Sequence, residues 1–291
     1  MKRTYQKQIT KKQSAVKNLL IFSTALSLSL FPTISISQSR LAIVIDDVGY
    51  RPKEDAAIYA MPKEISVAII PSAPYAKQRN QQAMQQGRDV LIHLPMQPMG
   101  NHKIESGGLT LGMTQQAVRE RVQNAKQVIS SAIGLNNHMG SAATADSDLM
   151  NKLMTVLKEQ HLFFLDSRTI GHSVASKTAK QYGIKALDRH IFLDDSDEFN
   201  NVQRQFQQAI TYARKQGTAI VIGHPRKNTI AVLQNGLRHL PQDIQLVNIG
   251  SLWRGEKIVP QKPFIMLFNA TPAPTSVAPF REIPLLRGIP K

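Results

Sequence analysis

Acidic and histidine side chains stand where several apolar runs of this sequence end. The run LAIVI at 41–45 is followed by Asp46 and Asp47, and later runs carry His93, His138 and His224 at or near their ends. A buried carboxylate without a partner costs far more free energy than a hydrogen bond returns. Convergence of these side chains on one ion or one substrate would supply the partners.

One carboxylate and two imidazoles form an open binding site for zinc or a similar divalent cation. A second carboxylate beside that site can take a proton from water. The two adjacent aspartates therefore favour one metal ligand and one catalytic base. The competing interpretation is structural, with each histidine hydrogen-bonded in a core and each aspartate capping the segment that follows.

The elements that must position these groups alternate between short apolar runs and longer amphipathic segments. The apolar runs span residues 41–45, 65–70, 89–94, 134–139, 162–166, 218–223 and 244–249, with a weaker one at 184–194. Helices are expected over 114–133, 146–160 and 197–217, because their apolar residues recur every three or four positions. Thr114 and either Asp146 or Ser147 are the expected N-caps, and Gly217 is expected to end the third helix.

Strands that are apolar on both faces and separated by helices predict a parallel sheet covered on both sides. About seven such units fit an α/β fold, either a distorted β/α barrel or an open doubly wound sheet. In both architectures the functional groups lie at the carboxyl ends of the strands. That rule places the acidic and histidine side chains at one rim.

The two ends of the 291-residue chain differ from its centre. Residues 1–39 run from basic to apolar to small, the order of a secretory signal, with an uncleaved anchor as the alternative. Residues 254–291 form a proline-rich segment expected to be an extended tail. We therefore expect an exported protein of the periplasm or cell envelope, with one folded domain over 40–253.

The formal net charge of +16 and the lack of cysteine narrow the function classes further. Neither a disulfide framework nor thiol catalysis is available. An exported basic protein is expected to meet anionic envelope polymers or lipid headgroups rather than nucleic acid. The tail could contact an anionic membrane surface or an envelope protein, and the alternative is that the charge only maintains solubility.

Five segments resemble the divergent polysaccharide deacetylase family, a distant branch of the carbohydrate esterases. They are IVIDDVG, LIHLPMQP, NNHMGS, FLDSRT and IVIGHP, in this order over residues 40–253. The resemblance implies a distorted β/α barrel and metal-dependent removal of acetyl groups from an envelope polysaccharide or amino sugar. It implies Asp46 as the base, Asp47 and His93 as ligands of a divalent metal, with zinc favoured, and His224 as the acid.

The sequence departs from the typical deacetylase pattern at two places. The second metal histidine, expected a few residues after His93, is missing from LPMQP at 94–98, and His102 lies further along in a loop expected to be exposed. We therefore expect His138 to complete the metal site. NNHMGS replaces the segment that usually carries an arginine. Arg168 would supply the lost positive charge, and the alternative is that Arg168 only pairs with Asp166.

The remaining polar residues at these strand ends are candidates for substrate binding. They are Asn137, Ser141, Asp166 and Arg168. The hypothesis of a metal-dependent carbohydrate deacetylase competes with that of a non-catalytic barrel that binds glycan or protein. A magnesium-holding, receiver-like domain is the weakest hypothesis, because magnesium prefers oxygen ligands to histidine.

Overall fold

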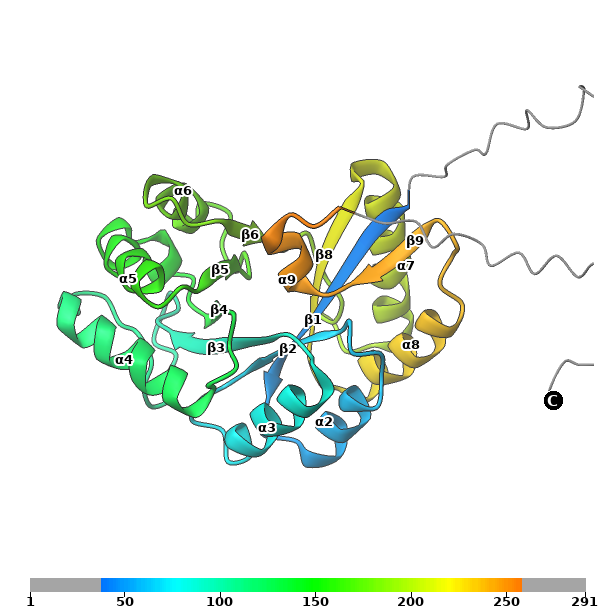
Figure 1. The fold of residues 1–291 in the computed structure, drawn as a ribbon, viewed down its shortest axis with the longest axis horizontal. Coiled ribbons are helices and arrows are strands. Elements are labelled where there is room, and N and C mark those ends of the chain that lie inside the picture. Colours follow the sequence, from blue (N-terminus) through cyan, green and yellow to red (C-terminus); the bar gives the residue numbers. More distant parts are fainter. Residues whose placement is uncertain (1–37, 258–291) are drawn as a thin grey trace, which may run out of the picture. The chain divides into compact units, whose positions relative to one another are not determined.

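The computed structural model describes residues 38–257, which form a curled parallel sheet with helices packed around its outer face (Figure 1). The strand order is β6-β5-β4-β3-β2-β1-β8-β7, and β9 adds to β1. The strands are β1 (Ser39–Val48), β2 (Ser66–Ile69), β3 (Val90–Met96), β4 (Gly134–Met139), β5 (Phe163–Asp166), β6 (Ala186–Asp188), β7 (Ile191–Phe192), β8 (Thr218–Gly223) and β9 (Ile244–Val247). This confirms the α/β barrel-like fold, in the form of a half-barrel.

Strand β1 is the centre of the sheet because it pairs with three others. Its first residues lie between β8 and β9, and its later residues lie between β8 and β2, all in parallel. Residues 41–46 are buried, as expected for a strand covered on both faces. Parallel pairing brings the carboxyl ends of these strands to one rim.

The number of strands exceeds the expected seven within residues 38–257. All seven apolar runs form strands, and the weaker run at 184–194 forms two more, β6 and β7. Strand β6 pairs with β5, whereas β7 pairs with β8. Arg189 and His190 make the corner, where their backbone N–H groups donate to Asp166 and Ile220. A segment that changes partners at a corner cannot keep one long apolar run.

The helices are α2 (Pro52–Tyr59), α3 (Ala76–Gln86), α4 (Gln115–Val128), α5 (Ser147–Glu159), α6 (Ala175–Gln181), α7 (Phe199–Gln216), α8 (Lys227–Arg238) and α9 (Ile249–Arg254), with a 3₁₀ turn at Ala143–Ala145. The three expected helices are present as α4, α5 and α7, although α4 ends at Val128 rather than near residue 133. Thr114 and Asp146 accept hydrogen bonds from the first turns of α4 and α5. Gly217 ends α7 in the left-handed conformation, which glycine adopts without strain.

Two apolar clusters pack against the opposite faces of the sheet. The larger one joins alternate strand residues to helices α2 to α8, and the smaller one joins the other strand residues to α9. In the smaller cluster Phe163 stacks on Trp253, with ring centroids 5.2 Å apart. His93 shares the face of Leu91, and Leu94 shares the helix-covered face, because side chains alternate along a strand.

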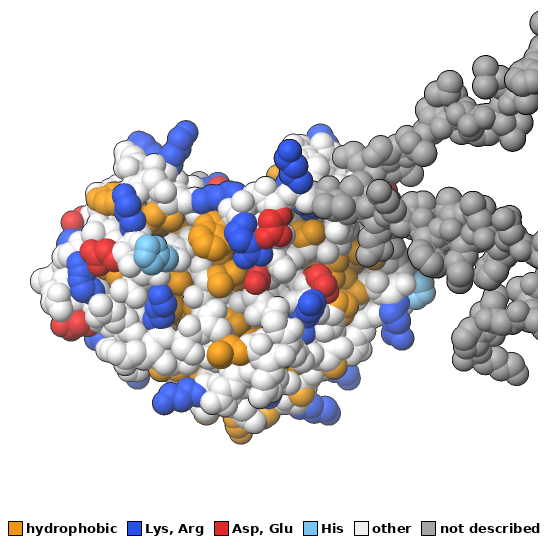
Figure 2. All heavy atoms as spheres, in the orientation of Figure 1, with side chains coloured by type: hydrophobic (Ala, Val, Ile, Leu, Met, Phe, Trp, Pro, Cys, Tyr) orange, Lys and Arg blue, Asp and Glu red, His pale blue; other side chains and the backbone are white. Residues whose placement is uncertain are grey.

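Basic side chains are distributed over the visible surface (Figure 2), and two expected segments lie largely outside the described residues. In the space-filling view, Lys and Arg side chains are spread over the visible face rather than gathered in one patch (Figure 2). Among the described helices none has the length and apolar character required to cross a bilayer. The expected leader and most of the expected proline-rich tail lie outside residues 38–257, although Ser39 is already the first residue of β1.

Candidate metal and acid–base site

An irregularity in β1 turns two adjacent carboxylates into the same site. The β1–β2 register shifts between Ile45 and Val48, and Asp47 has a φ of 56°, in the left-handed region. In a regular strand, neighbouring side chains would point to opposite faces. The bulge removes that alternation, so Asp46 and Asp47 both face the rim.

Strands β3 and β4 bring two histidines to the same place by register. His93 lies opposite Asn136, and Pro95 lies opposite His138. These four residues occupy one face, because each strand contributes positions two apart. His93 is 2% exposed, and the His138 side chain at the strand end is 14% exposed.

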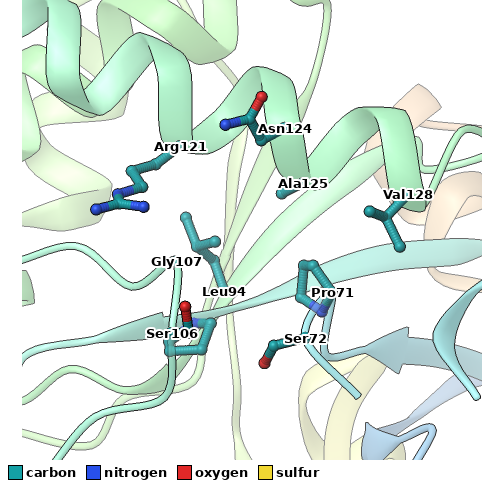
Figure 3. Close-up of a pocket in the computed structure, with 10 residues that line it drawn as sticks. Pro71, Ser72, Leu94, Ser106, Gly107, Arg121, Asn124, Ala125 and Val128 are labelled. Carbon is teal, nitrogen blue, oxygen red and sulfur yellow. The ribbon is translucent and has the colours of Figure 1, made fainter. Parts of the chain in front are cut away.

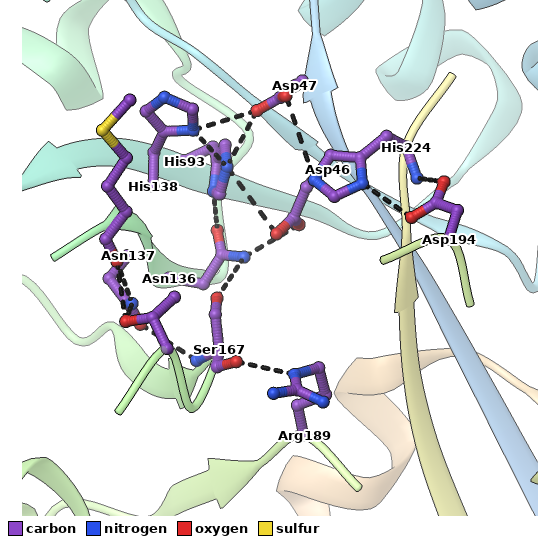
Figure 4. Close-up of polar contacts among 12 residues, drawn as sticks. Asp46, Asp47, His93, Asn136, Asn137, His138, Ser167, Arg189, Asp194 and His224 are labelled. Carbon is purple, nitrogen blue, oxygen red and sulfur yellow. Dashed lines mark hydrogen bonds and ion pairs between the residues drawn. The ribbon is translucent and has the colours of Figure 1, made fainter. Parts of the chain in front are cut away.

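Asp47, His93 and His138 converge on one point (Figure 4). Asp47 Oδ1 lies 3.2 Å from His93 Nε2 and 3.0 Å from His138 Nδ1. The two imidazole nitrogens are 3.1 Å apart. Two nitrogen lone pairs and a carboxylate oxygen at these distances require a proton or a cation among them.

This donor set fits a small divalent cation. Nitrogen and oxygen ligands held at about 2.0–2.2 Å from zinc stand about 3.3 Å apart in a tetrahedron, close to the spacing of this triangle. Asp47 Oδ1 is buried and has no hydrogen-bond partner of adequate geometry within the described chain. Three protein ligands also leave a position open for substrate.

Asn136 fixes which nitrogen of His93 faces the triangle. Its Oδ1 accepts a hydrogen bond from His93 Nδ1 at 2.9 Å, while its Nδ2 donates to Asp46 Oδ1 at 2.8 Å. With the Nδ1 proton committed to the amide, the lone pair of neutral His93 resides on Nε2. One buried amide thereby orients both a candidate ligand and the candidate base.

Glu105 lies behind the other imidazole. Its Oε1 is 3.3 Å from His138 Nε2, on the far side of the ring from Asp47. The loop that carries Glu105 is anchored at the end of β3, because Leu109 N donates to Pro95 O and Leu109 O accepts from Gln97 N. A carboxylate at this position favours a proton on Nε2 and a lone pair on Nδ1.

The charges of the site alter the pKa values of its members. Burial raises the pKa of Asp46, and neighbouring His93 and His224 offset this only in part. Burial also opposes ionisation of Asp47, but contacts with His138 and His93 outweigh it and hold the pKa of that carboxyl well below its usual range. Burial lowers the pKa of His93, yet Asp46 and Asp47 outweigh burial and raise this pKa to about 9.

His224 reaches the same rim from β8, with a carboxylate behind it. His224 Nδ1 donates to Asp194 Oδ1 at 2.8 Å, and Asp194 Oδ2 accepts from the backbone of His224 and from Thr229. His224 Nε2 then points to the site, 3.9 Å from Asp47 Oδ2. Burial lowers the pKa of His224, but bonding to Asp194 outweighs it and raises this pKa above its ordinary value.

The four residues expected to bind substrate occupy different positions. Asn137 is buried and joins two strand ends, since its amide donates to Met139 O and accepts from Ser167 N. Ser141 accepts from Met99 N. Asp166 is buried and accepts from Ser173 and from the backbone, not the guanidinium, of Arg168. These bonds stabilise the rim, and direct contact of the four with substrate stays a prediction.

Two hollows lie near this rim. A cavity of about 200 Å³ between β3 and α4 is lined by Leu94, on the helix-covered face of β3 and away from His93 (Figure 3). A larger open hollow of about 650 Å³ lies beside β7 and α7 and includes Arg168 and Phe192. The ring of Phe192 stacks on His224 with centroids 5.7 Å apart, so this second hollow adjoins the acid–base groups.

Sequence reasoning missed four residues that the structure places around the site. Asn136 and Asp194 had detectable signals, because each follows a short apolar run in the same way as the predicted residues. Glu105 comes from a loop without an apolar pattern, so only the folded chain shows its place. Arg189 was hidden in the corner between two very short strands; its guanidinium donates to Ser167 O at 2.6 Å.

The fold and the site define a class: a β/α barrel-like protein with a carboxylate–imidazole cluster at the carboxyl ends of its strands. The divergent polysaccharide deacetylase profile matches residues 43–253. The chain belongs to this family.

Three known proteins are similar to this chain in sequence or in fold. An uncharacterized protein of Haemophilus influenzae strain Rd is 67% identical over 279 residues, which is 96% of this chain and 98% of that protein. The uncharacterized protein YibQ of Escherichia coli K12 is 39% identical over 272 residues, covering 93% and 82%. A crystal structure of an uncharacterized Agrobacterium tumefaciens C58 protein shares the fold, with a TM-score of 0.71 and 21% identity over 74% of this chain and 89% of that one.

Proposed function

We propose that this protein is a metal-dependent hydrolase that removes acetyl groups from an envelope polysaccharide or amino sugar. The observation that carries the proposal is the arrangement of three candidate ligands between a buried carboxylate and a carboxylate-backed histidine. A hydrolase of amides needs these parts together: a place to polarise the carbonyl, a base for water and an acid for the leaving nitrogen.

Asp47, His93 and His138 would hold the cation, with zinc favoured by their mixed oxygen and nitrogen donors. When bound, the cation supplies Lewis acidity toward the acetyl carbonyl and toward water. Asn136 holds Nε2 of His93 toward it through the hydrogen bond to Nδ1. No change of rotamer is needed to assemble this donor set.

Asp46 is the candidate base. Asn136 occupies its Oδ1, which leaves Oδ2 to accept the proton as the water oxygen bonds to the acetyl carbon. A carboxylate whose pKa is raised by burial is a stronger proton acceptor than an exposed one. The base thus lies deep in the site, with its orientation fixed by the amide.

His224 is the candidate acid. Its Nε2 gives a proton to the leaving nitrogen as the carbon–nitrogen bond breaks, and the products are acetate and a free amine. Asp194 stabilises the protonated ring through Nδ1. An ester substrate would need this proton less, because an activated alcohol leaves more readily than an amine.

The test is acetate release by pure full-length protein, stripped of metal and reloaded with zinc, on acetylated envelope glycans. Asp46→Asn is the matched control, because it preserves shape and removes the proton acceptor. Release by the wild type that is absent from the control supports the proposal. Glycan binding without acetate release from any acetylated glycan would instead favour the non-catalytic barrel, and metal analysis of the wild type tests the zinc assignment.

We further propose that the protein is exported and meets its glycan in the cell envelope. The support is the basic-then-apolar order of residues 1–39 and the surplus of 36 Lys and Arg over 20 Asp and Glu. Mass spectrometry of protein from the envelope fraction tests this. A new N-terminus near residues 37–39 is expected, and an intact Met1 on membrane-bound protein would indicate an anchor.

A further inference from the structure

The open hollow beside the acid–base groups has a lining suited to a ligand. It lies where the chain turns from β6 into β7, against helix α7, and has a volume of about 650 Å³. Its wall includes the side chains of Arg168, Arg189, Phe192 and Tyr212. Guanidinium groups, an aromatic ring and a phenol together are typical of sites that bind polar ring compounds.

The hollow adjoins the atoms proposed to react. Phe192 links the hollow to the acid–base groups. Its ring stacks on His224, and the guanidinium carbon of Arg189 lies 4.1 Å from the centroid of the same ring. Since His224 faces the leaving nitrogen, the part of a glycan that carries this nitrogen extends toward Phe192. Substituents of the acetylated sugar or of its neighbour therefore reach the hollow.

The hollow also carries unbalanced positive charge. Arg189 donates to the carbonyl oxygens of Ser167 and Arg168, and buried Asp166 lies on its inner side. Throughout residues 38–257, no ion pair is formed by Arg168 or Arg189 with a carboxylate. Asp166 and Asp46 also act on Arg189, but the lining itself carries two guanidinium groups, of Arg168 and Arg189, and one carboxylate, the exposed Asp195. An anion in the hollow would balance the remaining charge and relieve the repulsion between the two guanidinium groups.

The backbone gives Arg168 a fixed place at the edge of this hollow. Its φ of 52° is a left-handed conformation that is strained for a non-glycine residue. Asp166 Oδ1 accepts from its N–H, and Arg189 donates to its C=O, so both backbone groups are held. Arg189 is committed to carbonyl oxygens, which leaves the side chain of Arg168 for an anionic ligand.

We propose that this hollow binds a carboxylate of the substrate, on the acetylated sugar or its direct neighbour, with Arg168 as its ion-pair partner. The inference rests on the proposed deacetylase function and narrows its substrate class to acidic glycans. A guanidinium group binds a carboxylate through two parallel hydrogen bonds, which also orient the sugar ring. Arg189 acts as a positioning residue that holds the backbone of Arg168 and adds positive potential.

The test compares acetylated oligosaccharides of equal length that differ in their carboxylates. One probe is neutral, one carries carboxylates on lactyl ethers, as in muramic acid, and one carries uronic acids. Zinc-loaded full-length wild type is measured beside Arg168→Gln. Arg214→Gln is the matched control, because this exposed arginine of α7 loses the same charge in a pair with Asp243.

We expect the wild type to favour one acidic probe over the neutral probe by about tenfold or more in kcat/KM, the scale of one charged hydrogen bond. Arg168→Gln should remove this preference by lowering kcat/KM on the favoured acidic probe more than on the neutral probe, whereas Arg214→Gln should keep the preference. The acidic probe that is favoured identifies the source of the carboxylate. Equal rates on all probes, or equal losses on all of them in Arg168→Gln, would overturn the proposal.

Calorimetric binding of the same probes separates this inference from the proposed function. Carboxylate-dependent binding that disappears in Arg168→Gln, without acetate release from any probe, would refute the hydrolase and retain the subsite. Acetate release without any carboxylate preference would retain the hydrolase and refute the subsite.

Discussion

Two histidines at the rim, one buried and one half-buried, are built alike and differ in one partner. His93 and His224 both donate from Nδ1 to a side-chain oxygen, at 2.9 and 2.8 Å, and both turn Nε2 toward Asp47. The partner of His93 is the neutral amide of Asn136, whereas the partner of His224 is the carboxylate of Asp194. An amide fixes the lone pair of an imidazole and favours its cation only weakly, whereas a carboxylate also favours the cation through its charge.

That one difference is consistent with the proposed roles of His93 as a ligand and His224 as an acid. The carboxylates that raise the pKa of His93 are Asp46 and Asp47, which lie at the position where a divalent cation would compete with a proton. Asp46 and Asp47 also raise the pKa of His224, but the largest contribution comes from Asp194, which lies behind the ring, where it would stabilise the proton that a leaving group needs. The position of negative charge relative to each ring thus supports the role proposed for each histidine.

The largest expected effect comes from removing the imidazole of His224. His224→Ala should lower turnover of N-acetyl substrates by about a hundredfold to ten-thousandfold and retain zinc, the range typical for general acid–base groups. Activated acetyl esters should be hydrolysed with a much smaller loss, because a nitrophenolate leaves without a proton. Equal losses on amides and activated esters would remove His224 from the role of acid.

Asp46→Asn should lower turnover by a comparable factor, because it removes the proposed base rather than the proposed acid. The amide keeps the shape but cannot accept a proton, so we expect about a hundredfold loss or more on amides and esters alike. Zinc content measured by elemental analysis should stay at the wild-type level. A variant that loses zinc together with activity would show that Asp46 is a ligand and not the base.

On the metal side, His138→Ala should lower zinc affinity at least about tenfold, measured by competition with a chromophoric chelator. Glu105→Gln should lower it by a smaller factor, between about threefold and tenfold, because the amide still reaches His138 but favours its Nε2 proton less. Glu159→Gln, which alters an exposed pair with Arg119, is the matched control and should bind zinc as the wild type does. Unchanged affinity in His138→Ala would exclude it from the metal site.

The smallest expected effect is a shift in pH dependence. His224 must be protonated to act as an acid, so activity should fall as pH rises through its raised pKa. Asp194→Asn removes the charge that raises this pKa, and the fall should therefore begin about one pH unit lower. The profile of kcat against pH measures the shift, with Asp243→Asn as a control at an exposed acid; a profile that keeps its position would contradict the comparison.

The sequence predicts the architecture well because each strand of the sheet interior is a continuous apolar run. Where that condition fails, prediction fails too: β6 and β7 have three and two residues, and their burial is only partial. For the same reason Asp194 was not recognised, although it follows β7 as Asp46 ends the run of β1. Runs shorter than about four residues carry too little periodicity to be read.

The candidate site could be predicted to the extent that strand ends reveal it. Asp47, His93 and His138 follow from the rule for parallel sheets, and the structure brings them together, while their metal binding stays a prediction. The bulge that turns both aspartates inward has no sequence pattern of its own. The contact of Glu105 with His138 depends on the path of a loop. The buried hydrogen bonds of Asn137 and Asp166 depend on residues that are distant in the chain.

The central position of β1 has a consequence for how the chain acquires its structure during synthesis. This first strand pairs with β8 and β9, and Arg40 bonds to Thr218 across 178 positions. A ribosome would therefore release most of the chain before β1 could obtain these partners, and its apolar edge would stay open meanwhile. C-terminal truncations before β8 should accordingly aggregate rather than yield a smaller folded barrel, because the first strand to be synthesised pairs with the last ones.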